Sequence, residues 1–456
     1  MLWLGRPFQP PMSNRSRKEK ADAKPVASDG SKDPVVGTSK PRLLGVLGPG
    51  LITGASDDDP SGIATYSQAG AQFGFGIQWI MLFSYPLMCA VQEISARLGR
   101  TTERGIAGNL RHHYPNWMLQ SIVVLLAIAN TINLGADLGA MGDVAQMLTG
   151  APRVLFVVFF AVLCATLQIF MSYSRYVAVL KWTTLSLFFY FGTVLFVKIP
   201  WTEFAAGFFI PRISWSADFL TITTAVLGTT ISPYLFFWQS SQEAEDERVK
   251  PYRHPLVKAP NESRHAFHRI RLDTYVGMAF ANLVALAIIT TTAATLHAKG
   301  VTDIETSQQA AEALRPVAGN FAFIIFSLGI IGTGLLAVPV LAGSTAYAVG
   351  ESRRWPVGLG RKPEEARAFY AVVAIATLVG MVLNFTPINP IKALFWTAVL
   401  NGIVSVPVMA TMMLVVTNPK VMSKFVIKGP LLWLGWIATF VMAASAIGTI
   451  VGAILQ

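Results

Sequence analysis

Long apolar runs alternate with short polar segments along the chain from about residue 44 to the C-terminus. Most of these runs hold about 20 residues, the length that a helix needs to cross roughly 30 Å of hydrocarbon. The pattern therefore predicts an all-α membrane protein with about eleven transmembrane helices. The predicted spans are 44–72, 76–97, 118–148, 153–171, 175–198, 218–247, 270–296, 320–350, 366–385, 390–417 and 430–454.

Three segments fall outside this pattern. Residues 1–42 are rich in Lys, Ser, Pro and Asp and have almost no apolar periodicity, so we expect a disordered basic cytoplasmic tail, followed by one transmembrane domain at 43–456. Residues 302–318 are rich in Ala, Glu and Gln and predict a short helix on the outer face. Residues 248–269 are basic and contain three prolines, which predicts an inner loop.

Composition and charge are also typical of an integral membrane protein. The mean hydropathy is +0.50, and 53% of residues are hydrophobic against 13% that are charged. The net charge of +11 could also suit nucleic acid, but the basic residues gather in 1–42, 248–271 and 353–367, which alternate with spans so as to lie on one side. Under the positive-inside rule this predicts a cytoplasmic N-terminus, an outer C-terminus and a bacterial inner-membrane protein in contact with lipid and not nucleic acid.

Several kinds of chemistry lose support. Cys89 and Cys164 both lie inside apolar runs, so neither a disulfide framework nor a thiolate metal cluster is expected. No histidine lies within a predicted span, which disfavours a zinc centre or a histidine proton relay inside the membrane. No nucleophile triad, hydrolase motif or phosphate loop is visible, so we expect no enzyme activity and no bound cofactor.

Two predicted spans contain helix-breaking sequences, and they are five spans apart. The first carries Pro60 in a stretch of glycines and acidic residues, and the sixth carries Pro233 after Gly228. Proline removes a backbone donor and clashes with the preceding turn, so each helix should break there. An ordinary kink would explain one break. Breaks at matching positions of two five-span halves predict an inverted-repeat transporter with its site at the bilayer midplane.

Three consecutive carboxylates at the first break, Asp57 to Asp59, need a reason, because charge inside a membrane is costly. A bound cation supplies one. Asp59 precedes Pro60 and is biased out of the helical conformation, so its carboxylate and nearby carbonyls can converge on an ion. Asp57 and Asp58 could instead face water or cap the break. The predicted metal ligands are Asp59, Ser56, Asp58, Gly62, Thr229 and Ser232.

All of these candidate ligands offer oxygen, which suits Mg²⁺ or Mn²⁺ as transported substrate. Further polar residues inside spans are weaker candidates for an ion pathway. Asn133 and Asp137 are four residues apart on one face of the third span, and Gln239 and Glu243 share a face of the sixth with the same spacing. Solvated acidic residues at a cytoplasmic helix end are the alternative for Glu243. Tyr234 completes this set.

The chain resembles the NRAMP family of divalent metal transporters over nearly everything from Gly45 to the last span. The resemblance implies a LeuT-like fold, in which spans 1–5 and 6–10 form two inverted repeats and an extra span follows. It also implies transport of a divalent metal ion. The stretches that carry it are 48–51, 59–65, 72–74, 96–99, 228–233 and 399–402.

The departures from the family's pattern concern the ion. The family's Asp-Pro-Gly-Asn reads Asp-Pro-Ser-Gly at 59–62, so the acid is kept and the amide is lost. Its Met-Pro-His-Asn reads Ser-Pro-Tyr-Leu at 232–235, which deletes the thioether and places Tyr234 and Leu235 where they need not face the ion. A later histidine corresponds to Gln239, and a glutamine of the tenth span to Ala398.

These replacements predict a wider, wetter site. Mg²⁺ gives up water reluctantly and is commonly held by one or two carboxylates plus retained waters. The pattern is similar to the NRAMP-related magnesium transporters, and this implies Mg²⁺ transport, with Mn²⁺ also carried, that is not coupled to protons. The nearest alternative is a proton-coupled Mn²⁺/Fe²⁺ symporter; a non-transporting metal sensor is the second. An organic-anion carrier is disfavoured, because the aspartates would repel an anion.

Overall fold

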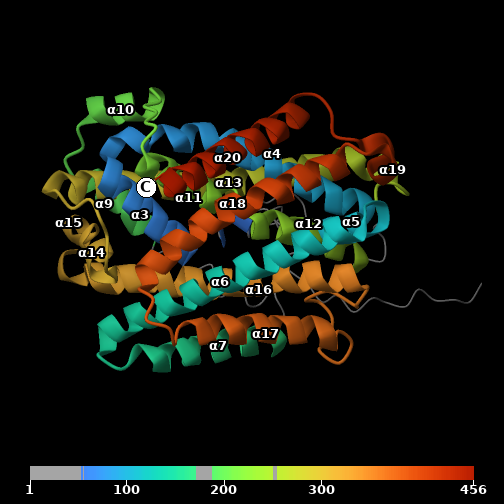
Figure 1. Cartoon of the computed structure of the whole chain (residues 1–456), viewed down its shortest axis with the longest axis horizontal. Coiled ribbons are helices and arrows are strands. Elements are labelled where there is room, and N and C mark those ends of the chain that lie inside the picture. Colours follow the sequence, from blue (N-terminus) through green and yellow to red (C-terminus); the bar gives the residue numbers. More distant parts are fainter. Residues whose placement is uncertain (1–52, 55, 171–186, 250–253, 456) are drawn as a thin grey trace, which may run out of the picture.

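The computed structural model describes residues 53–54, 56–170, 187–249 and 254–455, which fold into a nearly all-helical bundle (Figure 1). The predicted tail and the first half of the predicted fifth span, residues 175–186, lie outside the described residues. The longer helices are α3 (Pro60–Phe73), α4 (Trp79–Thr102), α6 (Asn116–Thr149), α7 (Arg153–Phe170), α11 (Ala217–Thr230), α12 (Pro233–Val249), α13 (Ser263–Thr295), α16 (Ala322–Arg353), α17 (Arg367–Leu383), α18 (Pro390–Val416) and α20 (Pro430–Leu455). Shorter helices are η1 (Gly74–Ile77), α5 (Ile106–His113), α9 (Phe188–Phe196), α10 (Trp201–Phe209), η3 (Pro260–Glu262), η4 (His297–Lys299), α14 (Ser307–Glu312), α15 (Arg315–Ala318), η5 (Gly319–Phe321), α19 (Pro419–Met422) and η6 (Ser423–Phe425).

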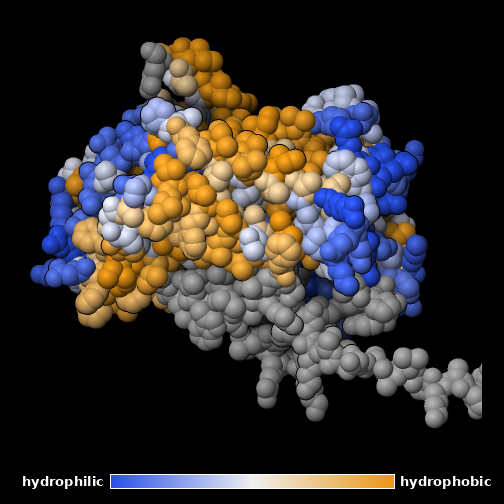
Figure 2. All heavy atoms as spheres, turned by 90° about the horizontal axis from the view of Figure 1, so that it is seen from below, coloured by the Kyte–Doolittle hydropathy of each residue, from blue (hydrophilic) through white to orange (hydrophobic). Residues whose placement is uncertain are grey.

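Length and hydropathy mark this bundle as membrane-spanning. Among the described residues, seven helices are long and apolar enough to cross a membrane, and up to eight if a bent pair is counted as one span. That pair, Pro60–Ile77 and Trp79–Thr102, bends by 110° between the first and second predicted spans. The helix α17 is a shorter apolar helix in the place of the predicted ninth span. Figure 2 shows an apolar band across the middle of one face, with hydrophilic residues at both ends.

The helices pack in two groups that are joined through α18. One group consists of α6, α7, α16 and α17, which lie together in Figure 1. The other contains α3, α4, α12 and α13, with α4 against both α12 and α13. Because α18 packs on α6 of the first group and on α3 of the second, it connects the two groups. The second half of each broken helix, α3 and α12, contacts helices of both groups.

Both predicted helix breaks are present. The chain is helical at Ser56 and Asp57, bends at Asp58 and is extended at Asp59, with φ −66° and ψ 171°, before α3 begins at Pro60. The helix α11 ends at Thr230, and α12 begins three residues later at Pro233. Proline suits the first turn of a helix, where its missing N–H would have no partner. Each proline therefore begins the second half of its broken helix.

The predicted inner loop at 248–269 is too long, because helices occupy both of its ends. The helix α12 continues to Val249, and α13 already begins at Ser263, after η3. Residues 264–269 therefore belong to the first turns of α13, and Arg269 pairs with Glu243 of α12. The basic residues of this segment indicated a loop. In the structure, Glu243 of α12 neutralises the charge of Arg269, so Arg269 can belong to a packed helix. The predicted outer helix at 302–318 is present as two short helices, α14 and α15.

Close contact between α11 and α18 makes Gly228 sensitive to substitution. A Cβ at Gly228 would lie 2.2 Å from the Ala398 carbonyl oxygen and 2.4 Å from the Gly402 nitrogen. Because backbone atoms cannot rotate away, we expect Gly228→Ala to destabilise the fold by about 1–3 kcal/mol. Thermal unfolding of purified protein in detergent measures this. Gly76→Ala is the matched control, since nothing lies within 4 Å of its added Cβ. Equal stability of the two variants would contradict the packing argument.

Candidate metal site

The carboxylate of Asp59 is held in place by the start of α3. Its Oδ1 accepts hydrogen bonds from the Gly62 backbone N–H and from the Ser61 hydroxyl, each at 2.7 Å. Asp59 is thus the N-cap of α3, a position at which aspartate binds the exposed amides of the first turn. The side chain is 1% exposed. One oxygen of Asp59 therefore has a structural role, and the other faces away from the cap.

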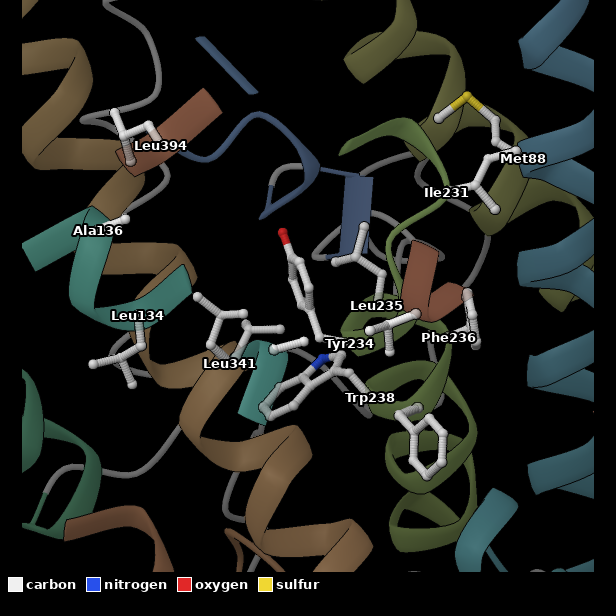
Figure 3. Packing of buried hydrophobic residues seen from close by; sticks show 14 of the residues in the cluster. Met88, Leu134, Ala136, Ile231, Tyr234, Leu235, Phe236, Trp238, Leu341 and Leu394 are labelled. Atoms are coloured by element: carbon white, nitrogen blue, oxygen red, sulfur yellow. The ribbon is translucent and has the colours of Figure 1, made fainter. Parts of the chain in front are cut away.

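The second oxygen of Asp59 has longer contacts, and both come from other helices. The Nδ2 of Asn133 on α6 donates to Oδ2 at 3.2 Å, and the Tyr234 hydroxyl of α12 donates to it at 3.3 Å. The Tyr234 hydroxyl also lies 3.1 Å from the Ser56 carbonyl oxygen. Figure 3 shows Tyr234 with its hydroxyl directed away from Trp238. The Oδ2 atom is therefore the oxygen best placed to bind a cation.

Oxygens of the sixth-span break lie opposite Gly62. Thr229 Oγ1 lies 3.1 Å from the position of a Cβ on Gly62, and the Asp57 carbonyl oxygen lies 3.2 Å from it. The Ser232 hydroxyl lies 2.8 Å from the Gly228 carbonyl oxygen and 2.7 Å from the Thr229 carbonyl oxygen. It donates its one hydrogen to this pair of acceptors and keeps lone pairs for a ligand. Because Gly62 has no side chain, the two breaks approach each other here.

The other two aspartates of the triplet are buried and lack groups that would stabilise their negative charge. Asp57 and Asp58 are at most 1% exposed, and none of their four carboxylate oxygens has a hydrogen-bond partner among the described residues. Both are close to Asp59 in the chain, so the three carboxylates repel one another when they are ionised. Uncompensated buried carboxylates are costly, so this negative region favours a cation.

The triplet does not form one carboxylate cage. No group of three or more His, Cys, Asp or Glu side chains that could hold a metal ion is found in the described part of the chain. An ion at Asp59 would therefore complete its shell with hydroxyls, carbonyls or water. The oxygens of Asp59, Ser56, Thr229 and Ser232 are of the type that Mg²⁺ and Mn²⁺ accept.

Of the weaker candidates, the structure brings three to the site and two elsewhere. Asn133 and Tyr234 contact Asp59 directly, and the buried Asp137 lies one turn along α6 from Asn133 on the same face. Gln239 instead accepts a hydrogen bond from the Thr53 hydroxyl at 2.5 Å. Glu243 lies a turn further along α12.

The alternative that Glu243 is a solvated acid is wrong. Its side chain is fully buried and forms an ion pair with Arg269 of α13. A buried carboxylate keeps its charge only with such a partner, so Arg269 stabilises the charge that water would otherwise solvate. The prediction that this face of α12 lines an ion pathway stays a prediction. The expectation that Tyr234 need not face the ion site is also corrected, because its hydroxyl contacts Asp59.

Two buried polar residues near the breaks were not among the predicted site residues. Tyr66 of α3 is fully buried and lies about two turns along the helix from Asp59. Asn401 of α18 lies between Ala398 and Gly402, whose backbone packs on Gly228, and neither of its side-chain amide atoms has a partner among the described residues. The signal for both was a polar side chain inside an apolar span.

Histidines lie away from Asp59. None of the four groups that bond Asp59 is a histidine. His297 contacts the Ala71 carbonyl oxygen through Nδ1 at 2.7 Å. In α5, outside the spans, burial and the nearby Arg104 lower the pKa of His112 and His113, which disfavours their charged form.

Two broken helices that meet at a buried carboxylate are the architecture of an inverted-repeat secondary transporter. Solved structures agree. MhsT in complex with L-phenylalanine aligns with a TM-score of 0.56 and 13% identity over 88% of this chain and 98% of that chain. The Eremococcus coleocola manganese transporter aligns with a TM-score of 0.73 and 14% identity over 93% of this chain and 91% of that chain. The predicted LeuT-like fold is confirmed.

The chain belongs to the Nramp family, because the model of that family, described as natural resistance-associated macrophage protein-like, matches residues 50–452. A curated relative, the divalent metal cation transporter MntH of Yersinia enterocolitica, is 28% identical over 319 residues, which are 67% of this chain and 73% of the relative. Nramp proteins are membrane transporters and not enzymes. The predicted integral membrane protein is confirmed, whereas the orientation of its termini stays a prediction.

Proposed function

We propose that the chain transports divalent metal cations across the inner membrane, with a partly hydrated ion held at Asp59 between the two breaks. Family membership and the names of the relatives support the divalent cation. The observation that carries the site is the pair of contacts to Asp59 Oδ2, which bring α6 and α12 to one carboxylate oxygen. That oxygen lies where both broken helices and the first helix group meet.

We further propose Mg²⁺ as the main substrate, Mn²⁺ as a second one, and no coupling to protons. The side chains that contact Asp59 offer hydroxyl and amide groups and no thioether or imidazole. Such a donor set favours a hard cation that keeps part of its water. This selectivity rests on donor chemistry and the departures at Ser232 and Gln239.

The alternative is a proton-coupled Mn²⁺/Fe²⁺ symporter. The printed names of the relatives, a divalent metal cation transporter and a manganese transporter, fit this alternative better than a magnesium carrier. A buried Asp137 beside Asp59 is a second acidic group that a proton could use. Both proposals share the Asp59 site and differ in the ion and in the proton.

Uptake into proteoliposomes discriminates between them. Vesicles loaded with a Mg²⁺-sensitive dye and, in parallel, with a pH-sensitive dye are given an inside-negative potential. We expect Mg²⁺ and Mn²⁺ to enter without acidification of the lumen. Entry of Mn²⁺ with acidification and without Mg²⁺ would establish the symporter instead. Metal binding by the purified protein without any uptake would identify a sensor.

A further inference from the structure

We propose that Tyr234 is a positioning residue that couples ion binding at Asp59 to the contact between the first break and α12. The inference rests on the proposed function, since it assigns a role at the same site. Tyr234 is the second residue of α12 and is 1% exposed. Its hydroxyl lies 3.1 Å from the Ser56 carbonyl oxygen and 3.3 Å from Asp59 Oδ2.

The hydroxyl has two acceptors and one hydrogen. A phenol donates a single hydrogen bond and can accept through its lone pairs. The Ser56 carbonyl and Asp59 Oδ2 lie at similar distances, so they compete for this hydrogen. An ionised carboxylate is the stronger acceptor of the two. Without an ion, the hydrogen is therefore drawn toward Asp59.

A cation at Oδ2 reverses this preference. The cation withdraws electron density from the carboxylate and repels the positive hydrogen of the phenol. The hydrogen then turns to the Ser56 carbonyl, and the lone pairs of the phenol oxygen face the ion or one of its waters. Ser56 lies before the bend of the first broken helix, whereas Tyr234 begins the second half of the sixth. Ion binding thereby strengthens one contact that joins the two broken helices.

The role belongs to the hydroxyl and not to the ring. Figure 3 shows the Tyr234 side chain among apolar neighbours that include Leu341 and Trp238. Phenylalanine keeps this packing and removes only the oxygen. The test variant is therefore Tyr234→Phe. The matched control is Tyr370→Phe, because the hydroxyl of the buried Tyr370 of α17 also has two oxygen acceptors. These are the carbonyls of Leu359 and Arg361, at 3.4 and 2.9 Å.

Two measurements on the purified full chain test the role. The first is calorimetric titration with MgCl₂ and with MnCl₂. Tyr234→Phe should weaken binding about five- to tenfold, the usual net effect of one hydrogen bond, because no phenol oxygen then faces the ion or its water. The second is hydrogen–deuterium exchange around 53–59 with and without metal. Metal should protect this segment in the wild type and in Tyr370→Phe, and should fail to protect it in Tyr234→Phe.

The outcomes separate this inference from the proposed function. Wild-type affinity and wild-type metal-dependent protection in Tyr234→Phe would overturn the role of the hydroxyl while leaving the ion site intact. Equal weakening of metal binding in both variants would also overturn it, because the effect would then be one of general stability. If the wild type itself bound neither metal, the proposed function would fail together with the inference.

Discussion

Replacing Asp59 by asparagine is expected to abolish uptake of both Mg²⁺ and Mn²⁺ while the protein stays folded. Asparagine is as good an N-cap as aspartate, so the bond that Oδ1 accepts from the Gly62 N–H survives. What disappears is the negative charge that Oδ2 would offer to a cation. Uptake into dye-loaded proteoliposomes measures the loss, and size-exclusion chromatography with thermal unfolding checks the fold.

Asp59→Ala separates the two roles of this carboxylate. Alanine removes both the charge and the cap, so we expect no uptake together with a loss of about 1 kcal/mol in stability. The matched control is Asp143→Asn. Asp143 is also on a spanning helix, and its carboxylate accepts a hydrogen bond from the Ser307 hydroxyl of α14. Asp143→Asn should keep uptake. Normal uptake by Asp59→Asn or Asp59→Ala would sink the assignment of the site.

The second large effect is expected where α12 meets α4. Arg100 of α4 and Glu247 of α12 form an ion pair whose side chains are 3% and 1% exposed. Removing one partner of a buried pair leaves an uncompensated charge and costs about 3–5 kcal/mol. Arg100→Met should therefore lower the free energy of unfolding by that amount. Thermal and chemical unfolding in detergent measure it.

Two comparisons show whether the cost comes from the stranded charge. The double variant Arg100→Met with Glu247→Leu removes both charges and should recover most of the lost stability, since well-packed apolar residues replace a buried pair at little cost. Arg315→Met breaks the exposed pair with Glu312 and should change stability by at most about 1 kcal/mol. If the double variant is as unstable as Arg100→Met alone, the stranded charge is not the cause.

Local chemistry explains why the helices and their breaks could be predicted. Apolar runs of membrane length form helices wherever they occur, because unpaired backbone groups are too costly in lipid. The breaks were predictable because Pro60 and Pro233 act on their own turns. Asp59 was predictable as well, since the residue before a proline leaves the helical conformation, and the structure finds it extended.

Contacts between distant residues could not be predicted in this way. Tyr234 and Asp59 are 175 positions apart, and Asn133 and Asp59 are 74 apart. No local rule says which face of α12 or α6 turns toward the first break. The same reason explains the inner loop, where Arg269 looked like part of a solvated segment until its partner Glu243 was located on α12.

The sequence by itself determined the membrane class, the succession of spans, the two breaks and the acidic residue between them, because these depend on hydropathy and on backbone chemistry within a few residues. Only the tertiary structure decided which oxygen of Asp59 is engaged by the cap and which faces α6 and α12. It also decided that acidic residues of α12 are paired instead of solvated. These features depend on how helices rotate and pack against each other, and that is set by the sum of many contacts along the whole chain.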